Sequence, residues 1–521
     1  MRYLTYLFIG IISGLCSSCS QPTTSSEETI RIENGRFIDG HQRTVIWNGL
    51  NLVEKDPDKG YVQDIDENLF IKFRDWGINC VRYGIHWDGL EPEPGVYNEI
   101  YLTELDKRVR WARENDIHLI LDMHQDLYSR KFGNGAPIWA TLDEGLPHIT
   151  GKVWSDAYLI SPAVQKSFDN FWQNTPASDG VGIQDHYINV WKTLAKRYAD
   201  STSVIGFDIM NEPFVGSQAP LIFQELLKGF VHYLTRQGVT IKGNTDKGQI
   251  WTDDRQRLEA LNLLDDSKVF RSILSYAEEM VSSFEENQLS EFYQKVRDAI
   301  RSTGNQKIIF LEHNYFCNLG IESTFRFPVA EKGKKDELCA YAPHAYDLVV
   351  DTQGATNPGF QRLNTIFEQI IHSSQQRNVP MIIGEWGAFY MGNNYAQPAL
   401  HHIKWIEQAL AGQTYWAWWP EIETQDYFPL VLSRPYPQYV NGKPISYHHD
   451  PSKKCFTCTW EENSSSAPTE IFVPNIKQLS KDKIQLSPIS SFEIKGMSEN
   501  SQSGILLIKP IGKNRKLTIS F

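Results

Sequence analysis

The chain has 521 residues, a formal net charge of −12 and an aromatic content of 12%, including 15 tryptophans. This length suits a large barrel with a second module better than one small core. The negative charge argues against nucleic acid as a partner and against electrostatic docking on anionic lipid.

The N-terminus reads as a targeting signal. An apolar stretch over residues 3–15 follows a basic start, and small residues close it. The stretch is shorter than the ~20 residues that a spanning helix needs. Cys19, followed by the polar run SQPTTSSEE, resembles the acylated cysteine of a bacterial lipoprotein, although Cys16 stands where that signal usually carries an aliphatic residue. We predict a signal peptide over 1–19, a polar tether over 20–30, and an exported protein that is either a bacterial cell-surface lipoprotein or plainly secreted.

Eight apolar segments have the character of buried parallel strands, and most of them end in polar residues. They cover residues 44–53, 79–87, 117–126, 204–213, 307–316, 339–346, 380–389 and 414–420. Between strands, apolar residues recur at helical spacing in four segments, 67–77, 102–116, 187–200 and 363–378. The alternation predicts an α/β fold, a (β/α)8 barrel, which we place over residues 31–428.

Two long insertions interrupt this repeat. Residues 128–182 are rich in aromatic side chains and poor in strand signals. Residues 214–305 contain amphipathic helices, with Ile222, Phe230 and Leu234 on one face together with Leu226. Insertions at the top of a barrel usually shape access to the site. The alternative is an ordinary elaboration of the fourth helix.

The pattern changes near the C-terminus. Short alternating segments separated by Ser, Pro, Gly and Asn predict a small antiparallel β-sandwich over residues 429–521. It carries no evident acid/base constellation, so it is either a packing partner of the barrel or a module that binds sugar or membrane. Cys455 and Cys458 form a lone CxxC, which is poor evidence for zinc. We expect two core cysteines rather than a disulfide.

Two glutamates stand out at the ends of predicted strands. Glu212 in FDIMNEPF ends the fourth strand, and Glu385 in IIGEWGAF ends the seventh. Carboxylates at the mouth of a barrel are placed for catalysis, and such a pair can cleave a glycosidic bond. Glu385 would attack the anomeric carbon, and Glu212 would serve as acid and then base. An enzyme that retains configuration would hold the two carboxyl groups ~5–5.5 Å apart.

Other strand ends carry side chains that could support this pair. These are Arg82, His124, Asn211, His344, Tyr346 and Trp418. Arg82 is expected to pair with Glu385, because an unpaired charge inside a strand is costly and a cation keeps the nucleophile ionised. Trp418 would form a stacking floor under the sugar. The histidines lie on different strands without metal-ligand spacing, so we predict neither a metal nor a cofactor.

Through this ordered set the chain resembles glycoside hydrolase family 5. The residues that carry the resemblance are Arg82, His124, Asn211, Glu212, Pro213, His344, Tyr346, Glu385 and Trp418. Family 5 consists of retaining enzymes with the acid/base on the fourth strand and the nucleophile on the seventh. The resemblance therefore implies these roles for Glu212 and Glu385.

Two further segments, LDMHQDLYSRKFGNGAPIWA and LSRPYPQYVNGKPISY, are similar to the endoglycoceramidase and glycosylceramidase branch of that family. Its members cleave the β-glucosidic bond between a glycan and ceramide, and they pair the barrel with a C-terminal β-sandwich. The resemblance implies that Lys55, Asp122, Asp126 and Asn211 contact the first sugar. Trp172 would add a stacking surface.

The sequence thus predicts a retaining β-glycosidase acting on glycosphingolipids. A β-glucanase or other β-glucosidase on the same scaffold is the first alternative. A non-catalytic carbohydrate-binding lipoprotein is the second, and the intact set of catalytic and supporting residues argues against it. We expect a monomer that meets a glycosphingolipid or other β-glycan at a membrane surface, through the substrate and an N-terminal anchor.

Overall fold

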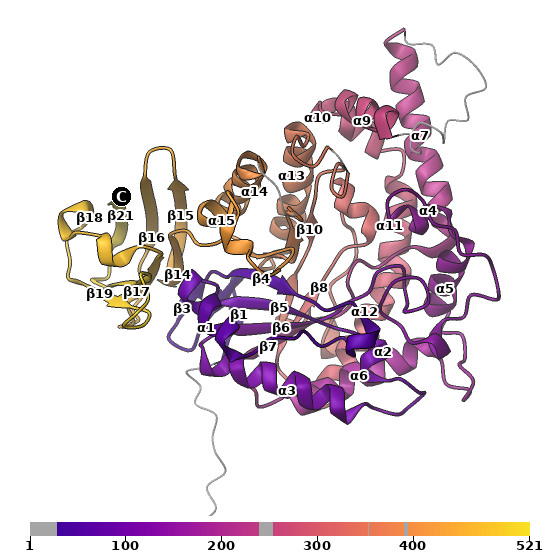
Figure 1. The fold of residues 1–521 in the computed structure, drawn as a ribbon, viewed down its shortest axis with the longest axis horizontal. Helices are drawn as coiled ribbons and strands as arrows, with labels where there is room; N and C mark the ends of the chain where they lie inside the picture. The colour runs from indigo at the N-terminus through magenta and orange to yellow at the C-terminus, as the bar shows by residue number, and fades with distance from the viewer. Residues whose placement is uncertain (1–28, 239–253, 353, 390–393) are drawn as a thin grey trace, which may run out of the picture.

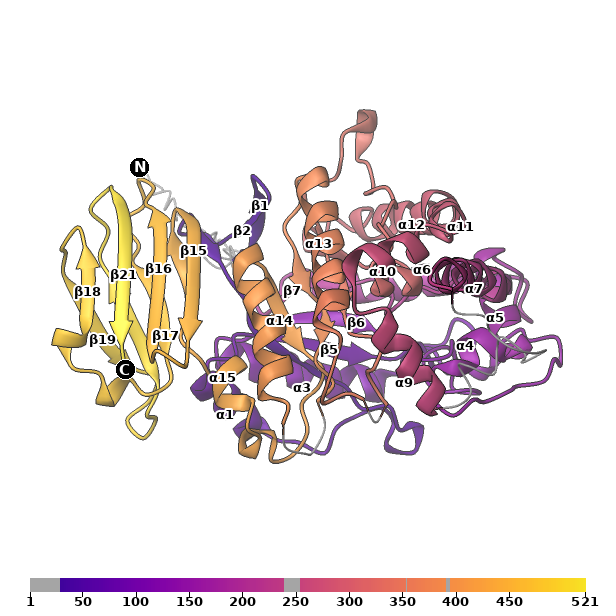
Figure 2. The ribbon, with the colours of Figure 1, turned by 90° about the horizontal axis from the view of Figure 1, so that it is seen from above.

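The computed structural model describes residues 29–238, 254–352, 354–389 and 394–521 (Figure 1). Cys19 and the predicted signal and tether as far as residue 28 lie outside these residues. A barrel surrounded by helices and a β-sandwich lie side by side, with most of the inserted helices on the side of the barrel away from the sandwich (Figures 1 and 2).

The predicted barrel is present, since eight parallel strands form one sheet in the order β11-β13-β4-β5-β6-β7-β8-β9. In chain order they are β4 (Asn48–Leu52), β5 (Cys80–Ile85), β6 (His118–Met123), β7 (Val204–Asp208), β8 (Ile308–Leu311), β9 (Cys339–Tyr341), β11 (Ile382–Ile383) and β13 (Gly412–Tyr415). A parallel bridge between Tyr341 and Met381 closes the sheet between β9 and β11. At the mouth, β10 (His344–Ala345) pairs with β12 (Glu385–Trp386), which sets His344 directly beside Glu385.

The inner face of the barrel changes from apolar to charged along each strand. Because side chains alternate between the two faces of a strand, every second residue points inward. At the lower level of the barrel, the inward-pointing residues are apolar. Two positions later along the chain, the inward-pointing residue is charged or polar. The pairs are Cys80 and Arg82, Ile120 and Asp122, Phe310 and Glu312, and Ala342 and His344. The strand sequences therefore place an apolar layer under a buried polar layer.

Helices cover the outside of the barrel. They are α1 (Glu67–Trp76), α2 (Trp87–Leu90), α3 (Glu99–Glu114), α6 (Ile183–Arg197), α12 (Ser290–Arg301), α13 (Phe360–Arg377), α14 (Ala396–Ala409) and α15 (Phe428–Val431). The four helices predicted from periodicity correspond to α1, α3, α6 and α13. The repeat is not complete, because residues 312–338 between β8 and β9 contain short 3-10 turns and no α-helix.

Both insertions fold into helices. The first contains α4 (Asp156–Ile160) and α5 (Pro162–Trp172). The second contains α7 (Ala219–Arg236), α9 (Asp254–Leu263), α10 (Ser267–Leu274) and α11 (Glu278–Phe284), and a π-helical turn joins α11 to α12. The predicted apolar face of α7 is confirmed, since Ile222, Phe230 and Leu234 are buried and Leu226 packs against the same core.

The β-sandwich consists of two antiparallel sheets. Its C-terminal strands are β14 (Tyr436–Asn441), β15 (Lys443–Asp450), β16 (Cys455–Glu461), β17 (Thr469–Val473), β18 (Ile484–Ser487), β19 (Phe492–Gly496), β20 (Gly504–Ile508) and β21 (Asn514–Ser520). The side chains of Phe456, Trp460, Phe472 and Leu506 are buried in its core. Cys455 and Cys458 are free thiols; Cys458 is buried and Cys455 is half-buried.

The N-terminal strands belong to the sandwich sheet. β1 (Arg31–Glu33), β2 (Arg36–Ile38) and β3 (Arg43–Val45) extend that sheet, because β3 pairs with β14. The single strand predicted over 44–53 is therefore wrong, since residues 43–45 pair with the sandwich and only 48–52 with the barrel. Gly77, at φ +81, ends α1 where Phe472 of the sandwich packs so closely that a Cβ would meet its ring at 2.3 Å.

None of the helices in the described ranges combines the length and the apolar character needed to cross a membrane.

Candidate active site

A pocket of about 210 Å³ opens at the carboxyl ends of the barrel strands, and both predicted catalytic glutamates line it. Of the other predicted residues, Lys55, His124, Asp126, Asn211 and Tyr346 also line it. The first insertion contributes Trp154 and the second contributes Arg257, so both insertions shape the pocket. A larger cavity of about 670 Å³ lies between the barrel and the sandwich, but no predicted site residue lines it.

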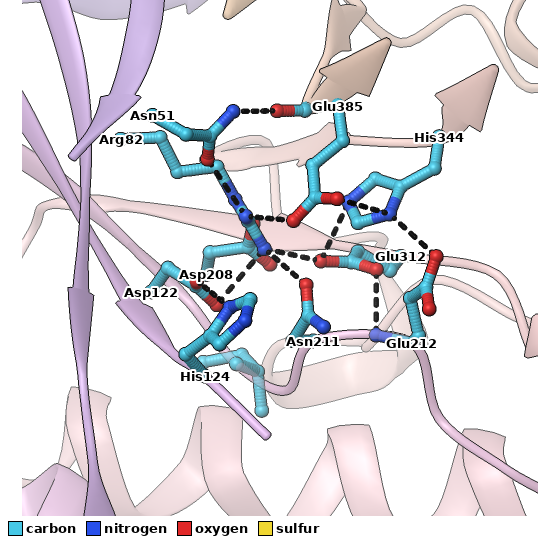
Figure 3. Close-up of polar contacts among 12 residues, drawn as sticks. Asn51, Arg82, Asp122, His124, Asp208, Asn211, Glu212, Glu312, His344 and Glu385 are labelled. Carbon is cyan, nitrogen blue, oxygen red and sulfur yellow. Dashed lines mark hydrogen bonds and ion pairs between the residues drawn. The ribbon is translucent and has the colours of Figure 1, made fainter. Parts of the chain in front are cut away.

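The two glutamates lie on either side of His344 (Figure 3). The Nδ1 atom of His344 is 2.9 Å from Glu212 Oε1 and 3.6 Å from Glu385 Oε2. One carboxylate oxygen of Glu212 lies within 4.8 Å of one of Glu385. This approach of the nearest oxygens is compatible with the ~5–5.5 Å between carboxyl groups in retaining glycosidases.

Each glutamate is held by its own donors. Arg82 Nη1 donates to Glu385 Oε1 at 2.7 Å, which is the predicted pairing, and the Tyr346 hydroxyl donates to Glu385 Oε2 at 2.9 Å. Asn318 Nδ2 donates to Glu212 Oε1 at 2.7 Å. Both oxygens of Glu385 and one oxygen of Glu212 are thereby held before any substrate arrives.

Arg82 is the centre of a buried ionic cluster (Figure 3). Besides Glu385, its nitrogens lie 2.8 Å from Asp208, 2.8 Å from Glu312 and 2.9 Å from Asp122. Arg82 Nη2 also donates to Asn211 Oδ1 at 2.9 Å. All these groups come from strand ends on the inner face of the barrel, so the fold brings them to one guanidinium.

Charge and burial act in opposite directions on the nucleophile. Burial raises the pKa of Glu385 above its ordinary value, against the lowering effect of His344 and Arg82. Burial by itself would lower the pKa of His344, yet the facing carboxylates of Glu312 and Glu385 raise it well above the ordinary value. The facing carboxylates thus favour the protonated form of His344, whose Nδ1 lies within hydrogen-bond distance of Glu212 Oε1.

A second polar chain runs along the edge of the pocket. Lys55 Nζ lies 2.5 Å from Asp126 Oδ2, and His124 Nδ1 lies 2.8 Å from Asp122 Oδ2. Although burial opposes it, Lys55 and His124 hold the pKa of Asp126 well below its ordinary value. Lys55 and Asp126 thus line the pocket as an ion pair, and their contact with the first sugar stays a prediction.

Two groups of side chains within the described ranges are close enough to ligate a cation. They are Glu212, His344 and Glu385, and Asp122, Asp208 and Glu312. In the second group, the guanidinium of Arg82 already contacts all three carboxylates. In the first, His344 already donates to Glu212. In both groups, a nitrogen-bearing side chain of the protein, Arg82 or His344, therefore already faces the carboxylates.

The prediction for Trp418 is wrong. The last bridge of β13 joins Trp416 to Gly387; the backbone of Trp418 still donates to the carbonyl of Asn51, but its side chain does not line the pocket. Trp418 instead packs against Phe73, with ring centroids 6.3 Å apart. Trp416 lines the pocket; its ring stacks on His124 at 5.1 Å, and Lys55 Nζ lies 4.5 Å above it.

The prediction for Trp172 is also wrong. Its ring packs against Phe284 and Phe292 at the end of α5, and its Nε1 donates to the carbonyl of Phe214. The ring is half-buried between inserted helices and α12, and it does not line the pocket. Trp154, in the same insertion, is the aromatic residue at the pocket; its Nε1 donates to Asp351 Oδ2 at 2.9 Å.

Three of the predicted site residues lie beneath the pocket. Arg82, Asp122 and His344 have side chains that are no more than 1% exposed, and none lines the pocket. Asp122 is occupied by Arg82 and His124, so the prediction that it touches the first sugar is wrong. Arg82 and His344 instead contact the two glutamates that line the pocket.

The sequence analysis also missed Asp208, Glu312 and Asn318. Asp208 and Glu312 carry the same signal that identified Arg82, namely a charged residue at an inward position where a strand ends. Asn318 lies in a loop after β8, where no periodicity indicates the direction of a side chain.

The family models agree with this site. Residues 38–422 match the family described as Cellulase (glycosyl hydrolase family 5). Residues 434–519 match the glycoside hydrolase family 5 C-terminal domain. The chain belongs to glycoside hydrolase family 5.

Individual family 5 relatives carry a more specific description. Endoglycoceramidase I of Rhodococcus hoagii is 24% identical over 473 residues, which are 86% of this chain and 80% of that protein. An endoglycoceramidase of Cyanea nozakii is 31% identical over 217 residues, 36% of this chain and 42% of that protein. The structure of endo-glycoceramidase II from Rhodococcus sp. in complex with ganglioside GM3 has a TM-score of 0.69 at 25% identity, over 94% of this chain and 99% of that one.

Alanine substitutions at Trp416 and Trp418 distinguish the roles of these two residues. We expect Trp416→Ala to lower kcat/KM for an aryl β-glycoside by about 10- to 100-fold, because stacking and the cation–π contact with Lys55 together are worth about 1.5–3 kcal/mol. Trp418→Ala should lower the thermal unfolding midpoint and leave kcat/KM within about threefold. Initial rates and thermal unfolding of both variants test this, and the opposite pattern would restore Trp418 to the site.

Proposed function

We propose that this family 5 hydrolase is an endoglycoceramidase-like retaining β-glycosidase, which cleaves the bond between the glycan and the ceramide of glycosphingolipids. The observation that carries the reaction is the pair of glutamates around His344, within 4.8 Å of each other, with Arg82 on Glu385. The likeness to endoglycoceramidases over most of both chains supports the choice of substrate.

The proposed reaction is a double displacement. Glu385 attacks the anomeric carbon, the bond to the ceramide oxygen breaks, and Glu212 gives its proton to that oxygen. Ceramide leaves as an alcohol, and the glycan stays attached to Glu385 as an ester. Glu212 then takes a proton from water, the water oxygen bonds to the anomeric carbon, and the ester bond breaks. Two inversions leave the anomeric configuration unchanged.

The pocket has surfaces that suit both parts of such a substrate. Trp416 can stack on a sugar ring, and Lys55, Asp126 and Asn211 offer hydrogen bonds to its hydroxyl groups. Trp154, which is 45% exposed, offers a second aromatic surface at the rim. The remaining lining includes apolar side chains that suit lipid, namely Val153, Leu319, Leu348, Val350 and Ala388.

We also propose, from residues 1–19 alone, that the enzyme is exported and that Cys19 carries lipid. The monomeric state and the division at residues 30 and 428 stay predictions as well. A lipid anchor would hold the enzyme at a membrane where glycolipids arrive. Intact mass analysis of the mature N-terminus tests the anchor, because an unmodified Cys19 would leave plain secretion.

Product analysis tests the proposed function. Purified enzyme is incubated in parallel with lactosylceramide, glucosylceramide and β-glucan, and the products are identified by mass spectrometry. We expect intact lactose and ceramide from lactosylceramide, with β-lactose as the first anomer seen by NMR. Glu385→Gln should abolish turnover and leave glycolipid binding intact.

Other products would contradict the proposal in different ways. Glucose released only from glucosylceramide would indicate a glucosylceramidase. Oligosaccharides from β-glucan, with both lipids untouched, would overturn the lipid substrate and favour a glucanase. An α-anomer as the first product would overturn retention.

A further inference from the structure

Glu312 lies directly beneath the proposed catalytic pair. It follows β8 on the inner face of the barrel, its side chain is 1% exposed, and it does not line the pocket. It therefore does not touch the substrate. Its oxygens contact three groups, namely Arg82 Nη2 at 2.8 Å, His344 Nε2 at 3.3 Å and the backbone nitrogen of Glu212 at 2.8 Å (Figure 3).

Glu312 accepts a hydrogen bond from the backbone of Glu212, and this backbone has an uncommon conformation. Glu212 has φ +45, in the left-handed region that residues other than glycine seldom adopt. Such a conformation persists where surrounding groups fix it. Glu312 Oε2 accepts the N–H of Glu212, and Gln125 Nε2 donates to its carbonyl oxygen. The direction in which the Glu212 side chain enters the pocket thus depends on Glu312.

The contact between Glu312 and His344 affects the side chain of Glu212, because His344 also contacts that side chain. His344 Nδ1 donates to Glu212 Oε1 at 2.9 Å, while its Nε2 faces Glu312 Oε1. Glu312 therefore fixes the orientation of the ring that holds the Glu212 carboxyl group. Both the backbone and the side chain of Glu212 are tied to this one buried carboxylate.

We propose that Glu312 is a positioning residue for the general acid/base Glu212. The inference rests on the roles proposed above for Glu212 and Glu385. A simple counter-charge for Arg82 would not explain the arrangement, since Asp122, Asp208 and Glu385 already surround that guanidinium. Among the described residues, only Glu312 contacts Arg82, His344 and the backbone N–H of Glu212 together.

All three groups that face Glu312 are donors, which makes glutamine an informative replacement. A carboxylate accepts with both oxygens, whereas an amide accepts with one and donates with the other end. In Glu312→Gln, the NH2 group must face either the N–H of Glu212 or the nitrogens of Arg82 and His344. The side chain keeps its size, but one of the contacts through which residue 312 positions Glu212 is lost.

The test compares aryl β-lactosides with poor and good leaving groups. Phenyl lactoside needs a proton from Glu212 in the first step, whereas 2,4-dinitrophenyl lactoside does not. For Glu312→Gln we expect kcat/KM to fall by about 100-fold on the phenyl substrate and by less than about 10-fold on the dinitrophenyl one, because general acid catalysis contributes about 10²–10⁴-fold. Azide, which needs no general base, should raise the variant's kcat on the dinitrophenyl substrate and yield β-lactosyl azide.

Glu285→Gln is the matched control. Glu285 is also a fully buried glutamate that accepts backbone N–H groups, from Asn314 at 2.9 Å, from Phe325 at 3.1 Å and from Thr324, and none of these three residues lines the pocket. We expect any loss of activity in this variant to be the same on both lactosides. Circular dichroism gives the folded fraction, and the ratio of the two rates does not depend on it.

An equal loss on both lactosides for Glu312→Gln, without azide rescue, would overturn the positioning role. Should that variant not fold, Glu312→Asp is measured in the same way, and equal losses there would also overturn it. Aryl lactosides report on the reaction whether or not lipids are substrates. Wild-type enzyme that cleaves them and leaves lactosylceramide intact would remove the lipid proposal and leave the role of Glu312 standing.

Discussion

The active site depends on one buried guanidinium. Arg82 is 1% exposed and contacts four carboxylates, Asp122, Asp208, Glu312 and Glu385. A buried ionic group without a partner costs several kcal/mol, so none of these carboxylates would stay ionised there alone. Arg82 offsets that cost, and it also directs one oxygen of Glu385 so that the other faces Tyr346 and His344. The Glu385 carboxylate is thereby oriented before substrate binds.

The barrel makes this cluster possible. Parallel strands bring their inward side chains to one level, so residues that are hundreds of positions apart in the chain meet at a single guanidinium. His344 and Glu385 are neighbours in the β10–β12 ladder, and Asp208 comes from β7. The apolar layer beneath, which includes Ile120 and Phe310, excludes water and strengthens the electrostatic interactions above it.

The parts of the site that follow from strand periodicity could be predicted from the sequence. Glu212, Glu385, Arg82 and Tyr346 stand where apolar runs end, and the structure places them together. Asp208 and Glu312 stand at equivalent positions and could have been found in the same way. The aromatic residues were harder, because Trp416 and Trp418 differ only in where strand pairing stops, and Trp154 and Trp172 lie in an insertion without a repeating pattern. Pairing of β3 with β14 joins residues nearly 400 positions apart, and no local signal reports it.

Covalent trapping tests the central claim most directly, namely that Glu385, the carboxylate held by Arg82, is the nucleophile. A 2-deoxy-2-fluoro β-lactoside with a good leaving group forms the glycosyl-enzyme quickly and releases it slowly, so peptide mapping by mass spectrometry can locate the ester. The structure predicts a single label, on Glu385. A label on Glu212, Glu312 or another carboxylate would contradict the account.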